Sequence, residues 1–205
     1  MKKKKILMIH GFGGSKDSST GRTIQTIVND KHPEYEVVLE TFDLLDLIGT
    51  QQRIKEIMSN RDFSMIIAHS FGAFHALSYT DSVAKIVINP CLNPSKDIPR
   101  ILKQGTPDEL NSFEIFYESD EDALTKDLKK MEDKTLNAIQ SDPELRYTTF
   151  GIFGDNDELF SYRDDFKKLH RADDKRAILV PGKHHVPGES LIEGLDKAFH
   201  YFDTL

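Results

Sequence analysis

Short apolar runs that alternate with helix-like patterns are the feature that most constrains the fold of this chain. The first run, Ile6-Leu7-Met8-Ile9, contains no alternating polar residue. A strand covered on both faces has this pattern, whereas a strand with one wet face alternates apolar and polar residues. Similar runs predict strands at 37–39, 65–68, 86–88, 147–153 and 177–180. Helical patterns between them predict helices at 20–30, 48–58, 71–79, 162–170 and 191–202.

Strands that alternate with helices form βαβ units, which build a parallel sheet with helices on both faces. The sequence therefore predicts the α/β class, with a three-layer, doubly wound and mostly parallel sheet. In such sheets, ligands bind outside the carboxyl ends of the strands. We expect the residues that carry function to follow the strands directly.

One segment, at about 91–146, interrupts this rhythm. Within it, Leu124, Leu128, Met131 and Ile139 have the spacing of a single helix face. We expect one domain over residues 1–205 with this segment as a helical insertion. The insertion could cover the sheet end as a lid or merely extend the crossover between strands, and a second domain is the alternative.

Charge and composition exclude several classes of partner. The formal net charge of −7 argues against a nucleic-acid partner, because phosphate binding needs a basic face. The apolar run behind Lys2–Lys5 has four residues, whereas the core of a signal peptide needs roughly 7–15. No run approaches the roughly 18 apolar residues of a membrane helix. We expect a cytoplasmic protein without membrane insertion, and the oligomeric state stays open.

The segment Ala68-His69-Ser70-Phe71-Gly72 lies between a predicted strand and a predicted helix. A strand that turns sharply into a helix needs small residues two positions before and after the turn, and Ala68 and Gly72 are small. The Ser70 hydroxyl would then project above the sheet at a helix N-terminus, where the helix dipole favours developing negative charge. This pattern predicts a nucleophilic serine. A serine that caps a buried helix is the alternative.

The segment His10-Gly11-Phe12-Gly13-Gly14-Ser15 directly follows the first predicted strand. Three glycines let the backbone turn sharply and direct N–H groups toward a site. Acyl transfer needs such donors for the oxyanion that forms when a hydroxyl attacks a carbonyl. A phosphate-binding G-x-G-x-x-G loop fails here, because Lys16 occupies the third glycine position. A purely structural turn stays the alternative, and His10 is expected to brace the loop.

A serine hydroxyl becomes a good nucleophile when a histidine takes its proton and a carboxylate orients that histidine. Downstream, Asp155 and Asp157 lie in an acidic turn after one predicted strand, and His184 and His185 follow the last strand. The acidic turn could also be an ordinary surface loop. Two adjacent histidines also suggest a metal, but third and fourth ligands at the usual spacing are missing, so we expect none.

Together these motifs resemble those of the α/β-hydrolases, in the chain order serine, acid, histidine. Ala68 replaces the first glycine of the G-x-S-x-G nucleophile elbow. The acid-loop pattern G-x-x-D-x-x-hydrophobic selects Asp157, with Asp155 as second choice. The pattern G-x-H-x-hydrophobic selects His184, with His185 as second choice. The resemblance implies that the backbone N–H groups of Phe12 and Phe71 form the oxyanion hole.

Within that superfamily, the chain is similar to the compact bacterial YqiA/YcfP-type esterases. The similarity includes the loop His10–Ser15, the elbow Ala68–Gly72, and the segments Ile88-Asn89-Pro90 and Gly182-Lys183-His184. It implies hydrolysis of a small-molecule carboxylic ester or thioester through an acyl-serine, with no metal or organic cofactor. A non-catalytic binding module that keeps the fold is the alternative, because a fold does not guarantee an activity.

Overall fold

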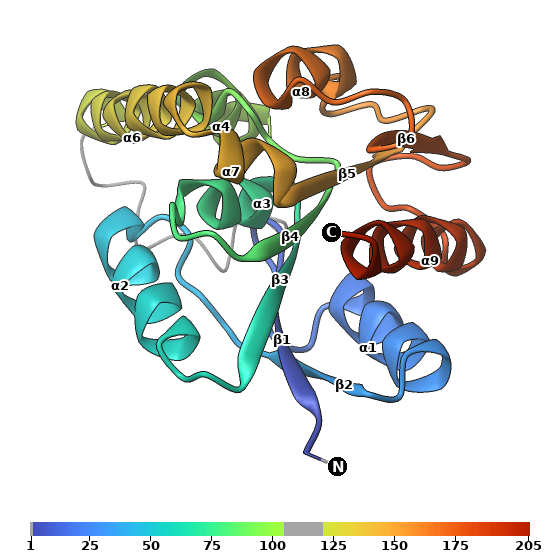
Figure 1. Cartoon of the computed structure of the whole chain (residues 1–205). Helices are drawn as coiled ribbons and strands as arrows, with labels where there is room; N and C mark the ends of the chain where they lie inside the picture. The colour runs from blue at the N-terminus through green and yellow to red at the C-terminus, as the bar shows by residue number, and fades with distance from the viewer. Residues whose placement is uncertain (1, 105–120) are drawn as a thin grey trace.

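The computed structural model of the chain describes residues 2–104 and 121–205 (Figure 1). Its described part contains a six-stranded sheet in which every neighbouring pair is parallel, in the order β2-β1-β3-β4-β5-β6. The strands are β1 (Lys4–Ile9), β2 (Tyr35–Leu39), β3 (Phe63–His69), β4 (Ala84–Ile88), β5 (Thr149–Gly154) and β6 (Ala177–Val180). The predicted α/β class and parallel sheet are confirmed.

Helices cover both faces of the sheet (Figure 1). One face carries α1 (Ser19–Lys31) and α9 (Gly188–Asp203). The other layer is formed by α2 (Leu47–Met58), α3 (Ser70–Ser78), α4 (Pro94–Gln104), α6 (Glu121–Ser141), α7 (Pro143–Tyr147) and α8 (Arg163–His170). This is the predicted three-layer arrangement.

The two faces of β1 explain why its apolar run does not alternate. Ile6 and Met8 pack in the core on the α1 and α9 side, whereas Leu7 and Ile9 pack in the core on the α3 side. All four side chains are buried. Full burial of one such side chain contributes about 1.5–3 kcal/mol, so a polar residue on either face would weaken the sheet.

One predicted strand boundary was wrong. The strand expected at 147–153 begins at Thr149, and Tyr147 is the last residue of the short helix α7. Asp142 caps this helix by accepting a hydrogen bond from the Glu144 N–H, and Pro143 occupies its first turn. Both features favour a helix start, and they override the strand preference of the aromatic residue that follows.

The described part of the 91–146 segment is helical, as expected. In α6, Leu128 and Ile139 are buried in the core on the α3 side of the sheet, and α6 contacts the helices α3, α4, α7 and α8. It extends the helical layer on the α3 side of the sheet (Figure 1). The part of the expected insertion at 105–120 lies outside the described residues. Within the part described, no helix is both long enough and apolar enough to cross a bilayer.

Candidate active site

Ser70 occupies a strained turn between β3 and α3. Its φ angle is +59°, in the left-handed region that residues with a Cβ rarely adopt. Such a conformation costs on the order of 1–3 kcal/mol and persists only where its surroundings enforce it. Gly72 is part of those surroundings, because a Cβ there would lie 2.0 Å from the carbonyl oxygen of His10. The small residue predicted at position 72 therefore lets α3 approach the backbone that follows β1.

The structure brings Ser70, His184 and Asp157 into one hydrogen-bonded chain. The Ser70 hydroxyl lies 2.9 Å from His184 Nε2, to which it can donate. On the other side of the ring, Nδ1–H donates to the Asp157 carboxylate, with both oxygens at 3.1 Å. The three side chains come from the ends of different strands and are nearly inaccessible to solvent. This arrangement allows proton transfer from the serine to a histidine that a carboxylate orients.

The Asp157 carboxylate is held by its own turn as well as by the histidine. Its Oδ1 accepts hydrogen bonds from the backbone N–H groups of Leu159, at 2.8 Å, and Phe160, at 3.0 Å. Burial works to raise the pKa of Asp157, but these donors and the His184 ring outweigh it and lower the pKa below the ordinary value of 3.8. The carboxylate is therefore ionised at neutral pH.

The second-choice residues lie in other positions. Asp155 Oδ1 accepts from the Gly182 N–H at 3.0 Å and from Asn156 Nδ2 at 2.8 Å, so it joins the acidic turn to the loop that carries the histidines. His185 is exposed, and its Nδ1 lies 3.5 Å from the Thr20 hydroxyl. Of the four candidates, Asp157 and His184 are the two in the hydrogen-bonded chain with Ser70.

The glycine loop after β1 forms a tight turn beside Ser70. Gly14 N–H donates to the Gly11 carbonyl at 3.0 Å, and Gly13 adopts a φ of +70°. His10 braces the loop, because its Nδ1–H donates to the Gly11 carbonyl and its Nε2 accepts from the Phe42 N–H. Burial lowers the pKa of His10, which keeps the ring neutral and leaves Nε2 free to accept.

The two residues expected to supply the oxyanion hole are neighbours. The rings of Phe12 and Phe71 meet edge to face, with centroids 6.1 Å apart. Phe71 lies in the first turn of α3, where backbone N–H groups have no acceptor within the helix. The glycine loop and the start of α3 thus place both backbone segments at the same end of the site.

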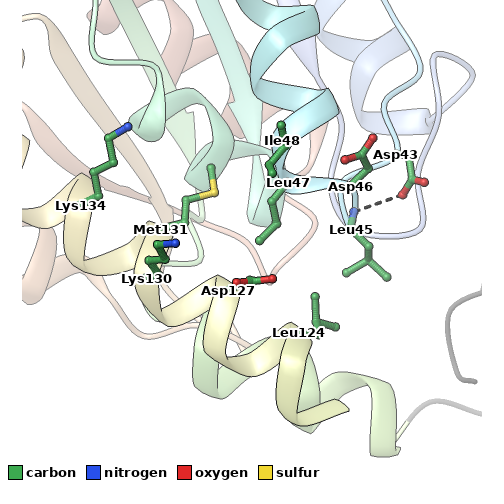
Figure 2. Close-up of a pocket in the computed structure, with 10 residues that line it drawn as sticks. All are labelled: Asp43, Leu45, Asp46, Leu47, Ile48, Leu124, Asp127, Lys130, Met131 and Lys134. Atoms are coloured by element: carbon green, nitrogen blue, oxygen red, sulfur yellow. Dashed lines mark hydrogen bonds between the residues drawn. The ribbon is translucent and has the colours of Figure 1, made fainter. Parts of the chain in front are cut away.

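A cavity of about 180 Å³ opens at Ser70 and His184. Its lining includes the apolar residues Phe12, Ile101 and Leu159 and the hydroxyl residues Ser18, Ser19 and Thr20. A larger groove of about 620 Å³ lies between the start of α2 and α6 (Figure 2). Its lining includes Leu47, Ile48 and Met131 and none of the residues predicted for the site.

Sequence reasoning assigned no part in the site to two buried residues that contact it. The Asn89 amide donates to the carbonyl oxygens of Lys183, at 3.0 Å, and His184, at 2.8 Å. Its Oδ1 accepts from the Gly154 N–H at 2.8 Å. His69 Nε2 donates to the same His184 carbonyl at 3.0 Å. Two signals were available: both residues follow or end a strand, where functional residues were expected, and Asn89 lies in Ile88-Asn89-Pro90, one of the segments that carry the family resemblance.

Within residues 2–104 and 121–205, no group of three or more His, Cys, Asp or Glu side chains is placed to hold a metal ion. Cys91 is buried, and its thiol lies 3.7 Å from Asp97 Oδ2. Burial, together with the Asp97 charge, raises the pKa of this thiol well above the ordinary value of 9.0. A protonated, buried thiol is a poor nucleophile.

Solved structures share this fold at low sequence identity. Est1E from Butyrivibrio proteoclasticus matches with a TM-score of 0.63 and 15% identity, covering 98% of this chain and 88% of that one. A monoacylglycerol lipase from Paleococcus ferrophilus matches with a TM-score of 0.61 and 11% identity, covering 97% and 96%. FphF, a fluorophosphonate-binding serine hydrolase from Staphylococcus aureus, matches with a TM-score of 0.58 and 14% identity, covering 98% and 83%. The chain has the α/β-hydrolase fold.

A comparison of the sequence with models of protein families identifies the family of this chain. Residues 5–187 match the model described as "Uncharacterised protein family (UPF0227)". The chain belongs to this family, which is YqiA-like, as the resemblance implied. A search of curated proteins found no match.

Proposed function

We propose that this protein is a serine hydrolase that cleaves carboxylic esters or thioesters through an acyl-serine formed on Ser70. The observation that carries the proposal is the continuous chain from the Ser70 hydroxyl through His184 to Asp157, with contacts of 2.9 and 3.1 Å. It stands at the carboxyl ends of parallel strands beside a cavity. Among proteins of this fold, the lipase and the fluorophosphonate-binding hydrolase named above also support a hydrolase.

In the first half of the reaction, Ser70 Oγ attacks the substrate carbonyl carbon while its proton moves to His184 Nε2. The Asp157 carboxylate stabilises the imidazolium that forms. The tetrahedral intermediate then collapses, and the bond to the leaving oxygen or sulfur breaks. The leaving group takes the proton from Nε2, so the acyl-serine forms with a neutral histidine.

Negative charge develops on the former carbonyl oxygen during this attack. The backbone N–H groups of Phe12 and Phe71 are the proposed donors to that oxyanion. Such donors stabilise the transition state more than the ground state, and losing one typically costs about 10²–10³-fold in kcat. Because both donors are backbone groups, their positions depend on the glycine loop and on the start of α3 rather than on side-chain rotamers.

The second half repeats the proton transfers with water. His184 takes a proton from a water molecule as the water oxygen attacks the acyl carbon. The bond to Ser70 Oγ breaks, Ser70 regains the proton from Nε2, and the carboxylic acid leaves. Each step uses this chain's own groups and water, so the reaction needs neither a metal nor an organic cofactor.

The lining of the cavity favours a small ester over a highly charged substrate. Phe12, Ile101 and Leu159 line the same cavity as Ser70, and a cavity of about 180 Å³ holds only a small group. A charged group placed against such side chains would lose hydration without gaining a partner. The proposed substrate is a small-molecule ester or thioester with an apolar portion near the carbonyl.

The proposal is tested by labelling with a fluorophosphonate probe, mapped by mass spectrometry. We expect the wild-type protein to be labelled at Ser70 and Ser70→Ala to be unlabelled. Hydrolysis of p-nitrophenyl acetate should fall by several powers of ten in Ser70→Ala and His184→Ala, whereas His185→Ala should retain activity. A folded wild-type protein that neither reacts with the probe nor hydrolyses esters would instead indicate a non-catalytic binding module.

A further inference from the structure

Asn89 lies at the carboxyl end of β4, between the acidic turn and the loop of His184. Its side chain is 1% exposed, and its amide makes the three hydrogen bonds described above. The partners fix the orientation of the amide, because Gly154 offers an N–H whereas Lys183 and His184 offer carbonyl oxygens. A carboxylate in this position would face two carbonyl oxygens. An apolar side chain would remove the partner of the Gly154 N–H and of the Lys183 carbonyl, and would leave the His184 carbonyl with His69 as its side-chain donor.

These hydrogen bonds connect the two loops that must meet for the proton relay. Gly154 ends β5 and lies three residues before Asp157, and the carbonyl groups of Lys183 and His184 flank the Cα of His184. A single buried side chain therefore spans from the acid's turn to the base's loop. The distance between Asp157 and the His184 ring depends on the separation of these two loops.

His69 adds a second donor to the same carbonyl oxygen. Its Nε2 lies 3.0 Å from the His184 oxygen, and its ring is 4.9 Å, centroid to centroid, from the His184 ring. Gly11 makes room for it, since a Cβ on Gly11 would lie 2.9 Å from His69 Nδ1. Burial, together with the neighbouring His184, lowers the pKa of His69 to about 3. At neutral pH, His69 is therefore an uncharged donor beside the base.

The backbone after β4 also contacts the nucleophile. Asn89 adopts a φ of +43°, and the Cys91 N–H donates to the Ser70 carbonyl oxygen at 3.1 Å. Asparagine tolerates positive φ better than most residues with a Cβ, which suits it to this turn. The turn directs the Asn89 side chain toward the base loop while the next residues support the turn at Ser70.

We propose that Asn89 and His69 are positioning residues that hold the His184 carbonyl, and with it the imidazole, in line between Ser70 and Asp157. This inference rests on the proposed hydrolase function. Neither residue exchanges a proton with the substrate. They act by fixing the peptide group of the base, and Asn89 also fixes its distance from the acid.

Two variants at position 89 test the proposal, with Ile86→Val as the matched control. Asn89→Gly keeps a residue that tolerates positive φ and removes the amide. Asn89→Asp keeps the size and the acceptor for Gly154 but removes both donors. Ile86→Val removes one buried methylene group from the same strand, β4, without touching the site. At position 69, Gln can place an N–H near the former Nε2, whereas Met has a similar length and no donor.

We expect kcat for p-nitrophenyl acetate to fall on the order of 10²-fold in Asn89→Gly and Asn89→Asp, because a displaced catalytic group of this kind costs about that much. KM should stay within about twofold, since neither side chain is proposed to bind substrate. His69→Gln should retain most of the kcat that His69→Met loses. In the proton NMR spectrum, the low-field signal of His184 Nδ1–H should shift or broaden in the impaired variants and stay in place in Ile86→Val.

The outcomes separate this inference from the proposed function. Fluorophosphonate labelling of wild type at Ser70 tests the function, and the variants test positioning only if that labelling occurs. Asn89→Gly and Asn89→Asp that melt like Ile86→Val yet keep wild-type kcat would overturn the role of Asn89. If the position 89 variants do not fold, the pair at position 69 decides: equal kcat in His69→Gln and His69→Met would overturn the proposal.

Discussion

Replacing Asp157 with Asn isolates what this carboxylate does, because the surrounding backbone dictates how an amide would orient. Oδ1 of Asp157 accepts from the N–H groups of Leu159 and Phe160. In Asp157→Asn, the amide oxygen must take this position, which turns Nδ2 toward the other oxygen site, 3.1 Å from His184 Nδ1. The Oδ1 site is also 3.1 Å from Nδ1, so donation from Nδ2 to Nδ1 competes with donation from Nδ1–H to the amide oxygen. The first of these populates the ring tautomer that carries its proton on Nε2.

Two losses follow from that orientation, and both reduce the rate. A ring protonated on Nε2 cannot accept the Ser70 proton, and a neutral amide no longer stabilises the imidazolium. In a serine protease triad, the same exchange lowers kcat about 10⁴-fold, which corresponds to about 5 kcal/mol of transition-state stabilisation. We expect a loss of that order here. The fold should be little affected, because the amide oxygen keeps both backbone hydrogen bonds.

The assay compares kcat/KM for p-nitrophenyl acetate and the rate of fluorophosphonate labelling with the thermal midpoint of each variant. Asp155→Asn is the matched control, because Asp155 serves as an acceptor for Gly182 and Asn156 and an amide oxygen can replace it. We expect kcat/KM of Asp155→Asn to fall by less than about tenfold. Asp157→Asn with activity close to wild type, or Asp155→Asn as the more damaging change, would refute the assignment of the acid.

Three further outcomes are expected. Ile101→Ala should widen the cavity at Ser70. The kcat/KM for a long-chain p-nitrophenyl ester, divided by the kcat/KM for the acetate, should then rise by about tenfold. An unchanged ratio would show that Ile101 does not limit the length of the acyl group. Gly72→Ala should destabilise the protein by about 1–3 kcal/mol or more in urea unfolding, because its Cβ would lie 2.0 Å from the His10 oxygen; an unchanged midpoint would contradict this packing. The free energy of unfolding should decrease as pH falls below about 6.5, by about 2 kcal/mol between pH 7 and 5 for each of three buried histidines. Burial lowers the histidine pKa from 6.5 to about 3 in His69, to about 4 in His75 and to about 3 in His170. The unfolded chain therefore takes up protons that the folded chain excludes. Urea midpoints that do not change over this pH range would contradict the last prediction.

The fold could be predicted because local sequence and tertiary burial agree. In β1 and β3, consecutive apolar residues reflect coverage on both faces, and the structure buries both sets. The spacing of Leu124, Leu128, Met131 and Ile139 predicted one helix face, and all four residues lie in α6. Tyr147 was misplaced, because a helix start at Asp142 and Pro143 decides that boundary and the aromatic residue does not.

The residues of the candidate site that directly follow strands could be predicted from the sequence. Ser70, Asp157 and His184 all follow strands of one parallel sheet, whose carboxyl ends converge. Choosing between His184 and His185 required the resemblance, because adjacent side chains in a loop have no periodicity that says which one turns inward. The contacts of Asn89 and His69 with the His184 carbonyl link residues 95 and 115 positions apart. No local pattern encodes pairings of that kind.

The strained residues show how the sheet itself organises the site. In the described part of the chain, the non-glycine residues with positive φ are Ser70, Asn89 and Arg171. His69 of β3 is in register with Ile88 of β4, so Ser70 and Asn89 are the next residues on two neighbouring strands. The turn at Ser70 costs on the order of 1–3 kcal/mol, whereas asparagine tolerates positive φ better than most residues. Both turns place a side chain at the same edge of the sheet. One of these side chains is the proposed nucleophile and the other holds the loop of its proposed base, so a register set by strand pairing fixes their relative positions.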